Sequence, residues 1–270
     1  MTQTVGWLLR EWRHRRGLSQ LDLALAADVS ARHVSLVETG RSNPSADMVL
    51  RLAAELEVPL RDRNRLLVAA GYAPRYRQRP LAGPALAAAR DAVTRVLTAH
   101  EPYPAIVFDR HWNIVTTNET AAAVLAAAVD PSAAAPANMV RLALTPGELR
   151  SRIVNFPEVR AFFRSRLSRQ LARTGDPAIE ALYQEFFAES AAEDLPAAEF
   201  DVVIPMIIRY AGHELQLFST ITTFGTPQDI TLDEISVESY YPADDRTAAT
   251  LRSLAETRRP TGVDHERAGD

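Results

Sequence analysis

The sequence predicts two domains of different classes, an all-α domain at the N-terminus and an α+β domain behind it. Its 270 residues, 47% hydrophobic and 24% charged, are enough for about two globular domains. Amphipathic helical blocks fill the first 70 residues, whereas strand-like alternation begins only after residue 100. The charge changes with them, because residues 1–80 hold thirteen arginines against eight acidic residues, a net charge of +5, and the remainder carries −9. This asymmetry indicates that only the first domain approaches a polyanion.

The composition argues against several classes of protein. The sequence has no cysteine, which removes disulfide frameworks and cysteine-based zinc sites. Its first residues carry charges where a secretory signal needs an apolar run, and no stretch reaches the roughly 18 apolar residues of a membrane span. The six histidines lack metal-ligand spacing, and no glycine-rich phosphate loop or nucleophile elbow is present. We therefore expect a cytoplasmic protein that is not an enzyme, carries no metal or required cofactor and does not contact a membrane.

Five short helices are predicted in the first domain from their apolar spacing and their capping residues. The first helix ends at Gly17, a residue that suits a left-handed C-cap. Ser19 begins the second helix, with Asp22 three residues on as in a capping box. Ser30 and Ser45 are sufficiently explained as caps of the third and fourth helices. The fifth helix spans about residues 60–70.

The second and third helices carry the most specific signal in the sequence. Two short helices joined by a three-residue turn match the geometry that places a recognition helix in the major groove of DNA. The motifs LSQLDLA from Leu18, VS from Val29, SLVETGR from Ser35 and PS from Pro44 follow in that order. Over about 70 residues they resemble the phage-repressor-like, or XRE-type, helix-turn-helix family.

The resemblance implies which residues contact double-stranded operator DNA. Gln20, at the N-terminus of the second helix, would contact a phosphate, and Arg32 is the best candidate for a bidentate guanine contact. Leu36 departs from the family, which more often has a polar or basic residue there, so it would contact a thymine methyl or a neighbouring side chain. Arg13 and Glu38 occupy the positions of an ion pair common in the family. The expected DNA-contacting residues are Gln20, Ser30, Ala31, Arg32, His33, Ser35, Leu36, Arg41 and Asn43.

The composition also sets the domain boundaries. The segment from Gly71 to Pro80 is too rich in proline and polar residues for a helix, and an alanine-rich helix follows over about 84–100. Beyond residue 255 the sequence has the character of a disordered tail. We predict a DNA-binding domain at 1–72, a linker at 73–84, a second domain at 85–255 and a tail at 256–270.

The second domain alternates between strand and helix patterns. Residues 105–108 and 112–118 predict a hairpin, and three more strands are predicted at 202–210, 214–224 and 235–241. Helices are predicted at 119–129, 157–173 and 177–190. These elements are enough for an antiparallel sheet of about five strands covered by helices.

The beginning of this domain resembles the MmyB-like ligand-binding domain, a PAS-like sensor. The resemblance is carried by Glu101–Ala105, by Asp109–Ile114 and by Asn118, and it is good over residues 60–120. It implies a cavity between sheet and helices that accepts a small, mostly apolar ligand such as a fatty acid. Arg160 and Arg164 would pair with a ligand carboxylate, although a solvated arginine face also explains them, and the apolar candidates also suit a plain core. The candidates are Phe108, Trp112, Phe156, Arg160, Phe163, Met206, Ile208, Tyr210 and Phe218.

Together these predictions describe a homodimeric, sequence-specific transcriptional regulator with a small-molecule effector. Two recognition helices would meet half-sites about one DNA turn apart. The alternative is a regulator whose second domain only dimerises or binds a protein partner, without a small ligand.

Overall fold

The computed structural model describes residues 3–126, 128–129, 132–188 and 206–258. The chain forms two compact units, each built from segments distant in sequence. The first unit comprises Met1–Asp91, Arg166–Gln184 and Thr223–Ile235, and the second comprises Ala92–Ser165, Glu185–Thr222 and Ser236–Asp270. The first unit therefore contains the predicted DNA-binding domain together with two segments from the second half of the chain.

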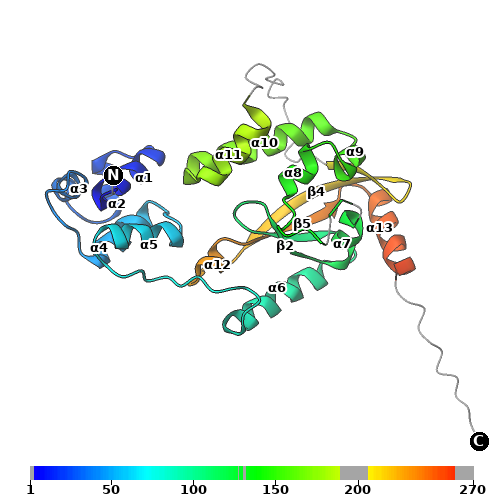
Figure 1. Ribbon diagram of the computed structural model, residues 1–270, viewed down its shortest axis with the longest axis horizontal. Helices are drawn as coiled ribbons and strands as arrows, with labels where there is room; N and C mark the ends of the chain where they lie inside the picture. Colours follow the sequence, from blue (N-terminus) through cyan, green and yellow to red (C-terminus); the bar gives the residue numbers. More distant parts are fainter. Residues whose placement is uncertain (1–2, 127, 130–131, 189–205, 259–270) are drawn as a thin grey trace, which may run out of the picture. The chain divides into compact units, whose positions relative to one another are not determined.

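The N-terminal part of the first unit is all-helical, as predicted, and its five helices are shown in blue to cyan in Figure 1. They are α1 (Val5–Arg15), α2 (Gln20–Ala26), α3 (Ala31–Glu38), α4 (Ala46–Glu55) and α5 (Leu60–Ala69). Ser19, Ser30 and Ser45 each accept a hydrogen bond from a backbone N–H of the helix they precede. Asp22 closes the predicted capping box by accepting from the Ser19 amide. Local sequence thus sets where these helices begin.

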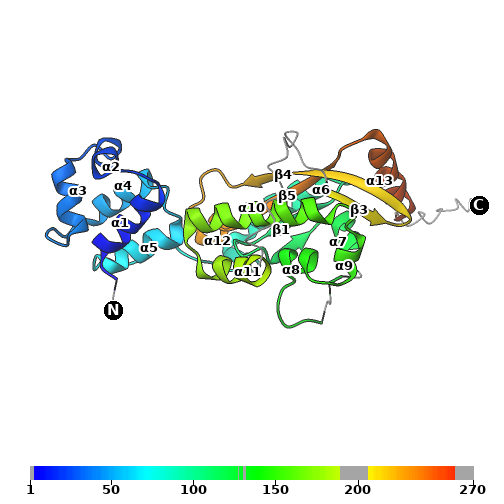
Figure 2. The same ribbon diagram turned by 90° about the horizontal axis from the view of Figure 1, so that it is seen from above.

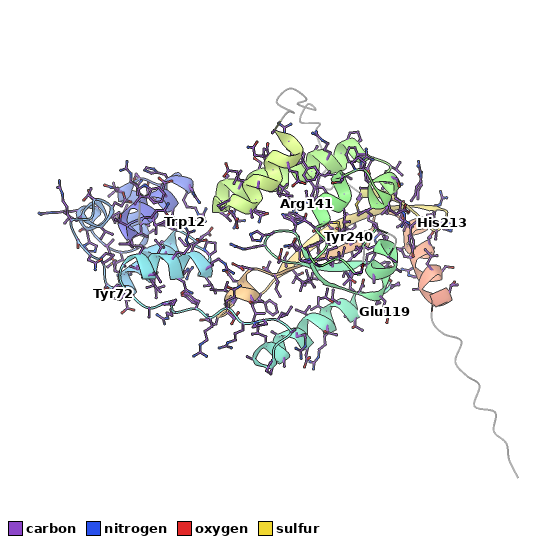
Figure 3. The ribbon with its side chains drawn as sticks, in the orientation of Figure 1. Trp12, Tyr72, Glu119, Arg141, His213 and Tyr240 are labelled. Atoms are coloured by element: carbon purple, nitrogen blue, oxygen red, sulfur yellow. The ribbon has the colours of Figure 1, made fainter. Side chains whose placement is uncertain are left out.

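One apolar core holds these helices together. Trp12 from α1 lies among them (Figure 3) and belongs to one cluster of buried residues that includes leucines and valines from the other four helices. The apolar positions of α2 do not all contribute to this core. Leu23 is fully buried, whereas Leu21 and Leu25 are 57% and 71% exposed, because they lie on the opposite face of the short helix.

The second unit is built on a five-stranded antiparallel sheet, which confirms the predicted α+β class. The strands are β1 (Ala105–Phe108), β2 (Ile114–Thr117), β3 (Met206–Tyr210), β4 (His213–Thr223) and β5 (Ser236–Pro242). Their order is β2-β1-β5-β4-β3. Ile106 lies opposite Thr117 on one side and Glu238 on the other, and Ile208 lies opposite Leu215. All four residues of β1 are buried, as expected of a central strand covered on both faces.

Helices cover this sheet. Figures 1 and 2 show α8 and α9 beside one face of it. The remaining helical elements of the chain are η1 (Pro84–Leu86), α6 (Ala87–Ala99), α7 (Glu119–Leu125), α8 (Met139–Leu144), α9 (Glu148–Arg152), α10 (Phe156–Thr174), α11 (Pro177–Phe187), α12 (Ile230–Asp233) and α13 (Asp245–Arg258).

Several boundaries differ from the sequence-based predictions. Helix α7 ends at Leu125 and not at residue 129. Helix α13 continues to Arg258, three residues into the predicted tail. Helices α8, α9 and α12 have six or fewer residues each, too short to show a helical period, and were not predicted. The predicted elements at 189–190 and 202–205, and the tail from 259, lie outside the described residues.

Candidate DNA-binding face and ligand cavity

Helix α3 is held by a close approach of α1. A Cβ atom placed on Gly6 would lie 2.2 Å from the Val37 carbonyl oxygen and 2.9 Å from that of Glu38. Real Cβ atoms do not come so close to backbone oxygen, so only glycine lets α1 reach the last turn of α3. Since α3 is the expected recognition helix, this contact sets its position in the domain.

An ion pair between Arg13 and Glu38, joined by a hydrogen bond from Gln20, fixes the same region. Arg13 donates from Nε and Nη2 to the two oxygens of Glu38 at 2.7 and 2.8 Å. Its Nη1 donates to the Leu18 carbonyl at 2.8 Å, just before α2. Gln20 then donates to Glu38 Oε2 at 2.8 Å. The pair expected from the family therefore ties α1, α2 and α3 together, and it also orients the side chain of Gln20.

The pKa values show that both charges are stabilised in the fold. Burial alone would raise the pKa of Glu38, but the hydrogen bonds from Arg13 and Gln20 outweigh it and hold the pKa below its ordinary value. The hydrogen bond to Glu38 raises the pKa of Arg13 further. The side chains are only 8% and 3% exposed, so this pair lies inside the domain and acts by positioning.

The expected DNA-contacting residues lie on and around α3. Arg32, Arg41 and Asn43 are exposed, and in the part of the chain that the structure describes neither arginine has an ion-pair partner. Ala31, Ser35 and Leu36 are partly exposed on the helix. Ser30 is exposed and caps the helix through its hydroxyl, which accepts from the His33 amide. The face thus combines unpaired guanidinium groups with small side chains.

His33 is placed differently from the other expected contacts. Its side chain is half-buried, and its Nε2 atom is buried without a hydrogen-bond partner among the described residues. The ring nitrogen therefore faces protein and not solvent in this structure.

The second unit contains an apolar cavity. Its volume is about 50 Å³. On the sheet side it is lined by Pro104, Ile106, Met206, Ile208, Leu215, Leu217 and Tyr240, and on the helix side by Ala121, Val124, Leu125, Met139, Ala143, Leu149, Ile153 and Phe163. Figure 3 shows Tyr240 on the sheet. Such a lining offers volume and apolar surface with almost no hydrogen-bonding groups.

The structure brings three of the nine candidate ligand residues to this cavity: Phe163, Met206 and Ile208. Trp112 lies behind the wall, with its ring 5.7 Å from that of Phe163 and 5.9 Å from that of Phe108. Phe218 stacks on Tyr241 at 5.4 Å, away from the lining residues of β4. Phe108, Phe156 and Tyr210 are likewise not among the lining residues.

Arg160 is also placed elsewhere. It donates to the Phe186 carbonyl at 3.1 Å and lies over the ring of Phe187 at 5.1 Å. These contacts join α10 to α11 and leave the guanidinium outside the lining of the cavity. In this structure Arg160 acts as a packing residue between helices.

Apart from Phe163, sequence reasoning missed the helix side of the cavity, because it concentrated on aromatic residues and strands. Asn138 is the signal that was available, since its side chain caps α8 by accepting from the Arg141 amide. Ala121 and Ala143 gave no such signal in the sequence. A small side chain indicates a cavity only when the residues that face it are known, and these lie far away in the sequence.

Two further findings concern the described residues as a whole. No helix among them is long and apolar enough to cross a membrane. Nor do they bring together three histidine or acidic side chains in an arrangement that could hold a metal ion.

Comparison with known proteins gives two family matches. Residues 89–254 match the model described as MmyB-like transcription regulator ligand binding domain, and residues 9–62 match a helix-turn-helix model. No curated protein matches the chain.

Several solved structures are similar to parts of the chain. The clp gene regulator ClgR from Corynebacterium glutamicum is 27% identical to this chain. The match covers 37% of this chain and 94% of the ClgR chain, with a TM-score of 0.23. The PAS domain of Bordetella pertussis BvgS is 15% identical, with coverages of 63% and 96% and a TM-score of 0.28. An RNA-binding light-oxygen-voltage receptor is 13% identical, with coverages of 95% and 64% and a TM-score of 0.28.

The helix-turn-helix and the α+β domain matched by the MmyB-like model define a DNA-binding transcription regulator with a ligand-binding domain. The MmyB-like model matches more than half of the sequence. This chain therefore belongs to the family of MmyB-like transcription regulators, with an XRE-type helix-turn-helix.

Proposed function

We propose that this regulator binds its operator sequence-specifically as a cytoplasmic homodimer, and that a small apolar molecule such as a fatty acid adjusts its DNA affinity. The observation that carries the ligand proposal is the cavity of about 50 Å³, whose apolar lining comes from both the sheet and the helices. This volume is below the roughly 300–1,000 Å³ typical of small-molecule sites, so a ligand would have to widen the cavity as it enters. An alkyl chain in it would gain about 25 cal/mol for each Å² of apolar surface removed from water.

The exposed face of α3 supports the DNA part of the proposal. Arg32 near the start of the helix has the length and donor geometry to bind guanine O6 and N7, a contact worth about 1–3 kcal/mol of discrimination. Arg41 and Asn43 follow α3, where they suit phosphate contacts. Gln20 is oriented by Glu38 and keeps a second amide hydrogen for a phosphate oxygen.

The DNA proposal is tested by selecting random duplexes with the purified full-length protein at a fixed salt concentration, followed by sequencing. We expect enrichment of an inverted repeat whose half-sites are about one helical turn apart. An enriched single half-site would contradict the homodimer, and the absence of any enriched sequence would contradict sequence-specific binding.

The ligand proposal is tested by thermal unfolding with dodecanoic acid as the probe. Binding to the native state raises the unfolding midpoint, and the rise grows with the logarithm of the ligand excess over its Kd. Ala121→Leu adds three carbons inside the cavity and should remove the rise, whereas Ala122→Leu, on the exposed face of the same helix, should keep it. Ala143→Leu fills the cavity from a different helix, α8. If it also removes the rise, the effect of Ala121→Leu comes from the filled cavity and not from damage to α7. Equal midpoint shifts in all variants, or none in the natural protein, would favour a domain that only dimerises or binds a protein.

A further inference from the structure

Helix α5 of the DNA-binding domain begins without a cap of its own. Pro59 precedes it and provides no side-chain hydrogen bond to the first turn. The amide of Leu60 instead donates to Asp233 Oδ2 at 3.0 Å. Asp233 is the last residue of α12, 173 positions further along the chain. A distant segment thus supplies the acceptor that the first N–H groups of a helix require.

The neighbouring residue makes a stronger contact to the same helix. Glu234 accepts from Nε and Nη2 of Arg61 at 2.6 and 2.8 Å. The two side chains are 13% and 29% exposed, so water screens this pair less than a surface one. A two-point, charge-assisted bond fixes direction as well as distance. Asp233 and Glu234 together therefore hold the first turn of α5.

A second contact lies at the end of α10. Arg16, just after α1, donates to the Arg173 carbonyl at 3.0 Å while also donating to the carbonyls of Leu56 and Glu57. Arg15 donates to the Thr174 carbonyl at 2.5 Å. Cations favour the C-terminus of a helix, where carbonyls are unpaired. Gly175 follows with φ of +59°, and a Cβ there would collide with the Arg15 guanidinium.

Both contacting segments are continuous in the chain with the walls of the cavity. Helix α12 lies in the connection from β4 to β5. Leu217 of β4 and Tyr240 of β5 line the cavity. Helix α10 carries Phe163 of the cavity wall ten residues before Arg173, about 15 Å along a helix. A displaced wall residue is therefore connected through regular secondary structure to a bond with the DNA-binding domain.

We propose that the Asp233–Glu234 pair is the coupling point through which an occupied cavity changes the DNA affinity of the helix-turn-helix, with the α10 end as a second support. This inference rests on the proposed ligand-controlled DNA binding. The ligand acts by favouring one of two states of the regulator, one with the α5–α12 bonds made and one with them broken. Without those bonds only the contact at the α10 end remains, and the coupling between ligand binding and DNA binding is weakened.

The test measures the operator Kd of the full-length protein with and without dodecanoic acid, at one salt concentration. We expect a ratio of at least about fivefold in the natural protein, the lower end of typical coupling. Glu234→Arg should lower the ratio towards one, and the swap Arg61→Glu with Glu234→Arg should restore it. Arg65→Gln is the matched control, because Arg65 lies on the same helix and its ion pair is a local one, with Asp62.

The outcomes separate this inference from the function on which it rests. A natural ratio of one would overturn ligand control, and the inference with it. A natural response that Glu234→Arg leaves intact would overturn the coupling point alone. Hydrogen exchange without the probe is a further check, since Asp233→Ala should speed exchange of the Leu60 amide about tenfold or more without affecting α3. Unchanged exchange at Leu60 would contradict the capping role of Asp233.

Discussion

The DNA-binding face and the cavity recognise their targets by opposite physical means. Around α3, a buried ion pair and directed hydrogen bonds hold a small number of exposed polar groups in place. In the second unit, fifteen lining residues offer volume and apolar surface. Directional sites fail when one atom is lost, whereas apolar cavities change gradually with volume. Substitutions in the two regions should therefore differ in kind, and the following predictions test that difference.

The largest effect is expected from Arg13→Ala. It leaves Glu38 buried without its cation, which should lower the free energy of unfolding by about 3–5 kcal/mol. Urea denaturation of the full-length protein measures the loss. Replacing both partners, as Arg13→Met with Glu38→Leu, should recover much of the stability while DNA affinity stays reduced, because Gln20 loses its acceptor. A stable Arg13→Ala protein would contradict the positioning role.

The next effect separates two kinds of DNA contact. Arg32→Ala should cost about 1–3 kcal/mol on the preferred operator and relax base preference at one position. Gln20→Ala should weaken all sequences alike. Repeating the duplex selection with each variant distinguishes them, and an unchanged base preference in Arg32→Ala would refute its assignment as a base reader.

A smaller effect is expected in the cavity. Ile208→Val removes one methylene from a fully buried lining residue and should lower the free energy of unfolding by about 0.5–1.5 kcal/mol. The enlarged cavity should also shift the best ligand towards a longer or bulkier chain, measured by thermal shift over a series of fatty acids. Val115→Ala, at an exposed strand position, serves as the control and should leave ligand preference unchanged.

The smallest effect is in the pH dependence, and it has opposite signs at two carboxylates. The pKa of Glu38 is lowered in the fold, so its contribution to stability is present above the ordinary glutamate pKa and is lost as the pH falls. Burial raises the pKa of Asp233 despite its bond from the Leu60 amide, so stability linked to it decreases as the pH rises through its folded pKa. Urea melts from pH 3 to 7 should become flatter on the acid side in Glu38→Gln, and Asp233→Asn should remove the opposing slope.

Sequence alone predicted the two regions unequally, for physical reasons. Caps such as Ser19 and Ser30 act within one turn of helix, so the N-terminal helices and the Arg13–Glu38 pair were predictable from local pattern and resemblance. The cavity depends on contacts between segments far apart in the chain, and only Phe163, Met206 and Ile208 were placed in it. The bond from Leu60 to Asp233 joins residues 173 positions apart and has no local signature.

The most direct test of this account compares the operator Kd of the natural protein and of Ala121→Leu, each with and without dodecanoic acid at a fixed salt concentration. The account predicts that the acid changes the Kd of the natural protein at least about fivefold. Ala121→Leu should bind DNA as the ligand-free natural protein does and should not respond to the acid. An equal response in both proteins would contradict the claim that the cavity controls DNA binding.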